Sequence, residues 1–228
     1  MQIEQYPDLR AFCQTDSYQQ WLRGWQAPIA HPAVDCWYDN EQDMWYWWRR
    51  HQWTPRQKYL SRVATRLPFY LLDSLQIGEL PCVDIGCGDN WFQQFYPTIW
   101  GVDPHSEAHR DELLTPEWWI PNWGRWPRAF SCNAMHFCDQ ATIRDNILKV
   151  RGILAPGGRA LVTLNRARIR DLTPDYSESA LRDTLEALPG LTRMVWIDER
   201  LPGGILSGGM DGNVWLWLEA GAHTLGAE

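Results

Sequence analysis

The stretch VDIGCGDN, residues 83–90, decides the fold of this chain. The apolar run Pro81–Ile85 leads into it and predicts a buried strand, and Trp91–Tyr96 predicts the start of a helix. Two glycines in such a strand-to-helix turn let the backbone approach a ligand closely, although a tight turn without a ligand also uses them. The turn is not the dinucleotide-binding pattern G-x-G-x-x-G, because Trp91 stands where the third glycine would be.

Two acidic residues sharpen this interpretation. Asp84 lies just before the turn, where its charge would repel a pyrophosphate and would suit a ligand that carries a positive amine. Asp103 ends the next apolar run, Thr98–Val102, and a carboxylate at that place accepts the hydroxyls of a ribose. The alternative for Asp103 is a helix cap or a turn residue before Pro104.

The rest of the chain alternates between strand-like and helix-like segments. This order predicts an α/β fold with a mostly parallel, doubly wound sheet and helices on both faces. Between Pro104 and Trp126 a further strand is expected but its place is not marked. The expected strands are Arg128–Asn133, Arg159–Leu164, Thr192–Ile197 and Asn213–Glu219. The expected helices are Ser17–Trp25, Glu41–Arg50, Pro55–Leu75 with a kink or break at Pro68, Met135–Leu154 and Ser177–Ala187. A turn is expected at Ala155–Gly158.

Composition bounds the class of protein. Hydrophobic residues make up 45%, enough for a packed core, and the 16 tryptophans are far above the usual number. A net charge of −7 argues against a general nucleic-acid coat. Residues 1–54 are predicted to form a Trp-rich cap and residues 55–228 the main domain. The six cysteines form no CxxC pair, so we expect reduced thiols and no metal site, and the absence of a signal peptide or a long apolar run predicts a cytoplasmic protein.

Four runs together resemble the class I S-adenosylmethionine (SAM)-dependent methyltransferases. They are VDIGCGDN at 83–90, WGVDP at 100–104, AFSCNAMHF at 129–137 and ILAPGGRALVTLN at 153–165. NVWLWLE at 213–219 is similar to the antiparallel last strand of that family. The amino-acid sequences of these runs are also similar to those of small methyltransferase-like proteins encoded by tailed phages. The resemblance implies SAM as the cofactor and methyl transfer as the activity.

The resemblance also implies roles by position. Asp84 would hold the SAM amino group, and Asp103 would accept the ribose hydroxyls, with Pro104 and His105 near the adenine. Asn90 replaces the last glycine of the turn, and Asn tolerates the left-handed backbone that the turn needs. The implied cofactor-binding residues are Asp84, Gly86, Gly88, Asn90, Asp103, Pro104, Asn133, Ala134 and Met135. The acidic residue expected near the adenine has no counterpart, and the candidates to line the adenine instead are Trp118, Trp119, Trp123 and Trp126.

The methyl acceptor is not marked by a motif. SAM is already reactive, so alignment and exclusion of water supply much of the catalysis and no base is obligatory. His136 is the candidate general base, and its alternative is an ordinary packed histidine in a first helical turn. Tyr176 is a weaker candidate on a loop over the acceptor.

A basic and aromatic segment offers a second clue to the acceptor. Residues 44–72 hold six Lys or Arg and no acidic residue. Trp48, Arg62 and Arg66 there suit a nucleotide or single-stranded nucleic acid, and the alternative is a solvated face over a packed cap. The sequence therefore predicts a SAM-dependent methyltransferase acting on a small molecule, a nucleotide or a nucleic acid. The alternative is a protein that keeps the methyltransferase fold for binding or assembly without catalysis.

Overall fold

The computed structural model describes residues 1–25, 67–78, 80–88, 90–105, 110–135, 140–173, 175–198 and 212–221. The expected helix Glu41–Arg50 and the first part of the expected helix Pro55–Leu75 lie outside these residues. Four candidate site residues also lie outside them: Trp48, Arg62, Arg66 and His136.

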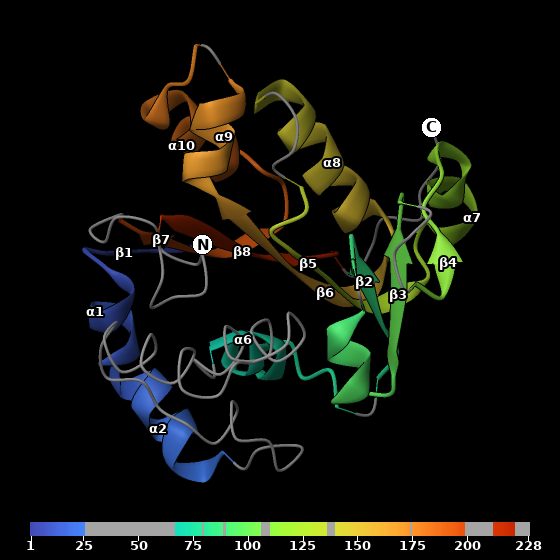
Figure 1. Ribbon diagram of the computed structural model, residues 1–228, viewed down its shortest axis with the longest axis horizontal. Coiled ribbons are helices and arrows are strands. Elements are labelled where there is room, and N and C mark those ends of the chain that lie inside the picture. The colour runs from blue at the N-terminus through green and yellow to red at the C-terminus, as the bar shows by residue number, and fades with distance from the viewer. Residues whose placement is uncertain are drawn as a thin grey trace, which may run out of the picture.

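Eight strands form one sheet in the order β1-β7-β8-β6-β5-β2-β3-β4 (Figure 1). Neighbours are parallel except where β8 pairs antiparallel with β6 and with β7. This confirms the predicted sheet, including its antiparallel last strand. The strands are β1 (Gln2–Tyr6), β2 (Cys82–Ile85), β3 (Ile99–Asp103), β4 (Glu112–Leu113), β5 (Trp126–Cys132), β6 (Leu154–Asn165), β7 (Leu191–Ile197) and β8 (Asn213–Glu219).

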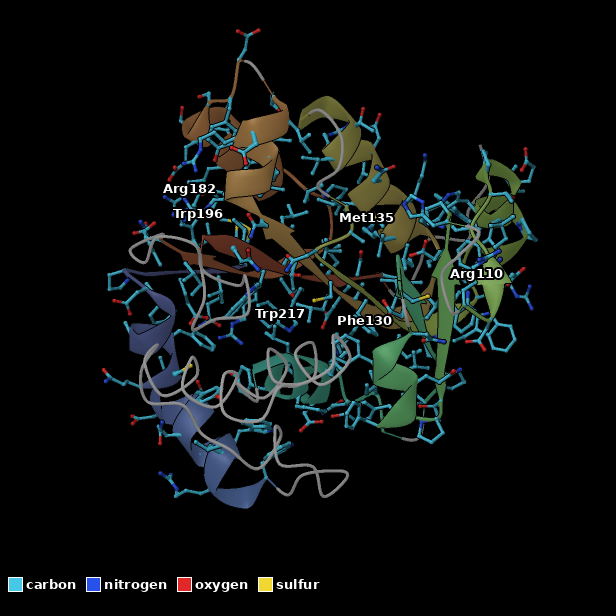
Figure 2. All side chains as sticks on the ribbon, in the orientation of Figure 1. Arg110, Phe130, Met135, Arg182, Trp196 and Trp217 are labelled. Carbon is cyan, nitrogen blue, oxygen red and sulfur yellow. The ribbon has the colours of Figure 1, made fainter. Side chains whose placement is uncertain are left out.

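Helices cover both faces of the sheet (Figure 1). Figure 2 shows Phe130 and Trp217 on one face, and Met135 and Trp196 on the other. On the first face lie α1 (Leu9–Cys13), α2 (Asp16–Gly24), α6 (Leu67–Ser74) and the 3-10 helix η1 (Trp91–Gln94). On the second lie α8 (Gln140–Gly152), α9 (Arg166–Leu172), α10 (Glu178–Glu186) and the pair η2 (Pro116–Trp118) and α7 (Trp119–Asn122).

Strand β8 shows why the core divides in two. Side chains of a strand alternate between the faces of a sheet. Trp215 and Trp217 accordingly pack on the α6 face, while Leu216 and Leu218 pack on the α8 face. Because both faces are covered, β8 reads as a continuous buried run rather than as an apolar and polar alternation.

Several elements differ from their sequence-based expectation. Strand β1 and helix α9 were not expected. The strand that was expected without a definite place between Pro104 and Trp126 is β4, which has only two residues. The helix expected at Trp91–Tyr96 is only the single 3-10 turn of η1. The expected turn Ala155–Gly158 lies inside β6, where the register to β5 shifts at a bulge. Pro68 lies in the first described turn of α6, a position that needs no backbone N–H.

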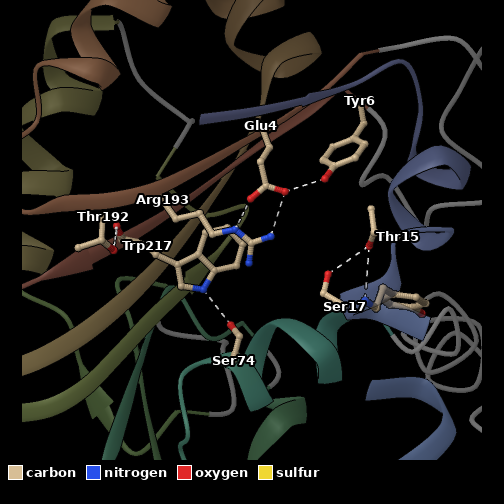
Figure 3. A network of polar contacts seen from close by, with 9 residues as sticks. Glu4, Tyr6, Thr15, Ser17, Ser74, Thr192, Arg193 and Trp217 are labelled. Carbon is tan, nitrogen blue, oxygen red and sulfur yellow. Dashed lines mark hydrogen bonds and ion pairs between the residues drawn. The ribbon is translucent and has the colours of Figure 1, made fainter. Parts of the chain in front are cut away.

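Strand β1 is held to the sheet by a half-buried ion pair between Glu4 and Arg193 (Figure 3). Arg193 Nε donates to Glu4 Oε1 at 2.6 Å, and the Arg193 guanidinium stacks 4.6 Å from the ring centroid of Trp217. Trp217 Nε1 in turn donates to Ser74 Oγ of α6 at 2.8 Å. The first residues thus complete the edge of the main sheet. The predicted boundary at residue 54 falls outside the described residues, so that division of the chain stays a prediction.

Candidate functional site

The glycine turn lies where the sheet reverses its winding, between β2 and β5. Ligands bind at such reversals, beyond the carboxyl ends of the strands. Gly86 N–H and Cys87 N–H both donate to Val102 O, at 2.8 and 3.2 Å, so β3 holds the turn in place. Gly86 has φ +77, and a Cβ there would stand 2.2 Å from the Cβ of Ala134. Gly86 is therefore needed because the end of β5 packs directly on the turn.

Gly88 is exposed, and the buried side chain of Asp103 lies beneath it. Gly88 has φ +53, and a Cβ at this position would meet no atom within 4 Å. Its N–H donates to Asp103 Oδ2 at 2.9 Å, while His105 N–H donates to Asp103 Oδ1 at 2.8 Å. Asp103 thus does act as a turn residue. Because each carboxylate oxygen has a second lone pair, the same side chain retains the capacity to bind a ligand.

Asp84 is a buried carboxyl beside Asp103. Its residue is only 2% exposed. Burial raises the pKa of Asp84 well above its usual range, and the negative charge of Asp103 raises it further. A cationic ligand group near Asp84 would offset the cost of a buried carboxylate next to Asp103, so this site favours a ligand with a positive charge.

The thiols of Cys87 and Cys132 are affected by burial and by the negative charge of Asp84. Burial, followed by the charges of Asp84, Asp103 and Asp111, raises the pKa of Cys87 to about 12. Burial likewise raises the pKa of Cys132 to about 11. Both thiols are therefore weaker acids here than a free cysteine, which disfavours the thiolate form. The four cysteines among the described residues are all free, as expected.

Asn90 takes the place of a glycine without disturbing the turn. Its backbone is left-handed, with φ 52 and ψ 40, as the sequence predicted. Its amide donates to Gln93 Oε1 at 3.0 Å and to Asp111 Oδ2 at 3.2 Å. A Cβ at Gly101 would stand 2.5 Å from Asn90 Cγ, so the bare backbone of β3 makes room for this side chain.

The residues after β5 lie next to the glycine turn, where Ala134 packs on Gly86. Asn133 is also left-handed, with φ 55, and it bonds to Thr163 and Asn213 on neighbouring strands. Met135 is 7% exposed and packs in the core under α8 (Figure 2). At the carboxyl ends of β2, β3 and β5, the structure thus brings together Asp84, Gly86, Gly88, Asp103, Asn133 and Ala134.

Other candidates lie elsewhere. Trp126 begins β5 and Trp123 precedes it. Both therefore lie at the amino end of this strand, whereas the glycine turn lies at the carboxyl ends of the strands, so the expectation that either lines the adenine is wrong. Trp118 is buried in the core under α8, and Trp119 and Tyr176 pack against that core. Asp111, Thr163 and Asn213 were missed by sequence reasoning. Each reaches the site through a partner distant in the chain. Thr163 lies in the run 153–165 and Asn213 begins the run 213–219, so both runs were noted without these residues being singled out.

Comparisons with known proteins agree with this architecture. No protein-family model and no curated protein sequence matches the chain. Among solved structures, the putative methyltransferase complexed with the Haloferax volcanii Trm112 methyltransferase activator matches with a TM-score of 0.51 at 14% identity, covering 82% of this chain and 100% of that one. The [4+2]-cyclase SpnF matches with a TM-score of 0.51 at 13% identity, covering 72% of this chain and 83% of that one. A SAM-dependent methyltransferase from Archaeoglobus fulgidus matches with a TM-score of 0.49 at 10% identity, covering 77% of this chain and 99% of that one.

The chain has the class I methyltransferase fold. That fold also carries a cyclase, so the reaction has to be argued from the site and not from the fold. The named structures do not bear on the resemblance to phage proteins, which stays a prediction. In the part of the chain that is described, no helix is long and apolar enough to cross a membrane.

Proposed function

We propose that the crevice between β2 and β5 binds SAM and that the chain is a SAM-dependent methyltransferase. The acceptor would be a small molecule, a nucleotide or a nucleic acid. One observation carries this proposal: two carboxylates, Asp84 and Asp103, flank a glycine turn whose second glycine opens onto free space. A ligand with an ammonium group and a ribose fits this set, and SAM has both.

Each residue would have a distinct role. Asp84 would pair with the ammonium group, which stabilises its carboxylate in a buried place. Asp103 would accept the ribose hydroxyls with its remaining lone pairs. Gly86 and Gly88 would line the methionine portion, and the described floor at Asn133 and Ala134 would close it from below. When bound, SAM supplies an electrophilic methyl group, and the protein aligns the acceptor and excludes water.

The acceptor side of the proposal rests on His136, Trp48, Arg62 and Arg66, which lie outside the described ranges, and on Tyr176, which is described. His136 follows the crevice floor directly in the chain and would serve as general base. Trp48, Arg62 and Arg66 would bind a nucleotide-like acceptor by stacking and charge. Tyr176 would contribute from the region after α9. The proposed location is the cytoplasm.

A second candidate is a protein that binds through this fold without transferring a methyl group. The match to SpnF favours keeping it, because a similar fold there belongs to a protein named as a [4+2]-cyclase and not as a methyltransferase. Incubation of cell extract with methyl-labelled SAM separates the two. A labelled product that requires the protein supports the transferase, whereas bound but untransferred label supports the second candidate.

Calorimetric titration with SAM tests the binding proposal. Asp103→Ala should weaken binding by about 10- to 100-fold, because charge-assisted hydrogen bonds to the ribose are lost. Asp103→Asn should weaken it less, since the amide oxygen still accepts one bond. Asp145→Ala removes an exposed carboxylate of α8 and should bind as the wild type does.

Melting of the ligand-free proteins must accompany this titration, because Asp103 also holds two backbone N–H groups of the turn. A wild-type protein that shows neither heat nor thermal stabilisation at millimolar SAM contradicts the proposal. NADH should have no effect, because the third glycine of the dinucleotide pattern is missing.

A further inference from the structure

Three polar side chains from three strands meet at the floor of the crevice. Asn133 follows β5, Thr163 lies near the end of β6, and Asn213 begins β8. Thr163 Oγ1 donates to Asn133 Oδ1 at 3.1 Å, and Asn213 Nδ2 donates to the same oxygen at 3.2 Å. Thr163 and Asn213 are buried, whereas Asn133 is half-buried. Of the three residues, Asn133 is therefore the one that is partly exposed.

These bonds fix which way the Asn133 amide points. The Asn133 N–H donates to Thr163 Oγ1 at 2.9 Å, so the hydroxyl hydrogen of Thr163 is left to donate to Asn133 Oδ1. With a second bond from Asn213, both lone pairs of Oδ1 are used. The Nδ2 group, on the other branch of the amide, is the part that faces away from the network.

The opposite orientation of the two amides is less favourable. It would leave the Thr163 hydroxyl hydrogen without its acceptor and would bury an unpaired N–H group of Asn213. The observed orientation leaves only one buried acceptor unpaired, Asn213 Oδ1. A buried acceptor without a partner is tolerated more often than a buried donor.

The amide stands beside the glycine turn. The next residue, Ala134, is the one that packs on Gly86. Asn133 N–H also donates to Thr163 O at 3.1 Å, which helps to hold the left-handed backbone of Asn133. The half-buried amide thus lies on the same side of the crevice as the turn.

We propose that Thr163 and Asn213 are positioning residues that hold the Asn133 amide so that Nδ2 donates to bound SAM. The inference rests on the proposed function. The ligand atom that accepts would be a carboxylate oxygen or a ring nitrogen. Thr163 and Asn213 do not touch the ligand themselves. Their contribution is to orient the donor before binding, which reduces the entropy lost when the ligand binds.

The central variant is Thr163→Val, which keeps the branched shape and removes the hydroxyl. Asn133 N–H retains its bond to Thr163 O, so the turn should persist. We expect SAM to bind about 3- to 10-fold more weakly, the loss of one oriented hydrogen bond. Thr163→Ser restores the hydroxyl and should restore the wild-type dissociation constant. Asn213→Leu removes the second donor at similar volume and should weaken binding in the same direction.

A matched control separates positioning from general stability. Thr192 lies in β7, and its hydroxyl donates to a backbone carbonyl, Trp217 O, at 3.2 Å. Thr192→Val should lower the melting temperature about as much as Thr163→Val does, with no change in SAM affinity. Calorimetry and thermal melting are measured on all variants together.

The outcomes are distinct. Wild-type affinity in a folded Thr163→Val protein overturns the inference and leaves the proposed function standing. Equal weakening by Thr163→Val and Thr192→Val overturns it as well, as does a Thr163→Ser protein that binds no better than Thr163→Val. If the wild type itself does not bind SAM, the proposed function fails and this inference fails with it.

Discussion

At Asp84 the needs of binding and of stability oppose each other. The carboxyl is buried next to a second acid, so its charged form is unfavourable in the folded protein without ligand. In the unfolded chain it ionises with an ordinary pKa near 4. The folded protein therefore binds more protons than the unfolded chain above that pH, and the stability contributed by this group falls as pH rises towards its raised folded pKa.

We expect Asp84→Asn to stabilise the ligand-free protein at neutral pH and to weaken SAM binding. Each unit by which the folded pKa is raised corresponds to about 1.4 kcal/mol of unfolding free energy above that pKa. The advantage of the variant should grow as pH rises from about 4 and then level off. Urea unfolding of both proteins from pH 4.5 to pH 8 measures it.

Asp145→Asn serves as the control for this series, because Asp145 is exposed on α8. Its difference from the wild type should hardly change with pH. An Asp84→Asn protein that is less stable than the wild type at pH 8 would show that the carboxylate already has sufficient partners in the ligand-free fold.

At the scale of elements, η1 and β3 fit together through Asn90 and Gly101. A Cβ on Gly101 would overlap the Asn90 side chain, whereas removal of that side chain would open the space. We expect Gly101→Ala to cost about 1–3 kcal/mol of unfolding free energy. In an Asn90→Gly background the same change should cost much less, because the clash is gone. Chemical denaturation of the four proteins gives the coupling energy.

Additive effects in that cycle would contradict the packing described here. Asn90→Gly by itself should cost little backbone strain, because glycine adopts the left-handed conformation readily. It does lose the hydrogen bonds to Gln93 and Asp111.

Elements with a strong local pattern were predictable from sequence. Strand β8 was bounded correctly from the pattern of NVWLWLE, although the strand is buried on both faces and does not alternate between buried and exposed residues. Helix α10 was also predicted, and in the structure Ser177 caps it. Helix α9 was missed because its arginine-rich sequence resembles a surface loop. Arg166 is in fact buried, with its Nη1 3.0 Å from Glu178 Oε1 and its guanidinium stacked on Trp196.

The residues of the candidate site also divide into those that the sequence predicted and those that it did not. Asp84, the two glycines and Asp103 lie in short runs whose chemistry is visible in the sequence. The supporting residues Asp111, Thr163 and Asn213 act through neighbours that only the folded sheet brings near. Register between strands, which sets those neighbours, depends on packing across the whole sheet.

At the scale of the whole molecule, strand β1 near the N-terminus belongs to the main sheet. The pKa of Glu4 is lowered overall: burial raises it, but the hydrogen bonds from Arg193 and Tyr6 outweigh burial. A lowered folded pKa contributes stability at neutral pH, and that stability is lost as pH falls through the carboxyl range.

Glu4→Gln should therefore lower the stability of the entire protein by about 1–2 kcal/mol at pH 7, the loss from a partly buried pair. The difference from the wild type should shrink as pH falls below about 4.5. Thermal melting should show one shifted transition. A separate early transition with an unchanged main one would mean that β1 is not part of the same cooperative unit.

The position of β8 has a consequence for synthesis. Of the described strands, β1 leaves the ribosome first and β8 last, yet β8 lies between β6 and β7 and joins the two parts of the sheet. Until β8 emerges, β6 lacks a neighbour on one side, and β1 and β7 have no bonded link to the rest of the sheet. Unpaired strand edges and uncovered tryptophans attract other chains. A pause in translation shortly before residue 213 would thus prolong the state in which the growing chain is most prone to aggregate. The sheet can be completed only after β8 has been synthesised.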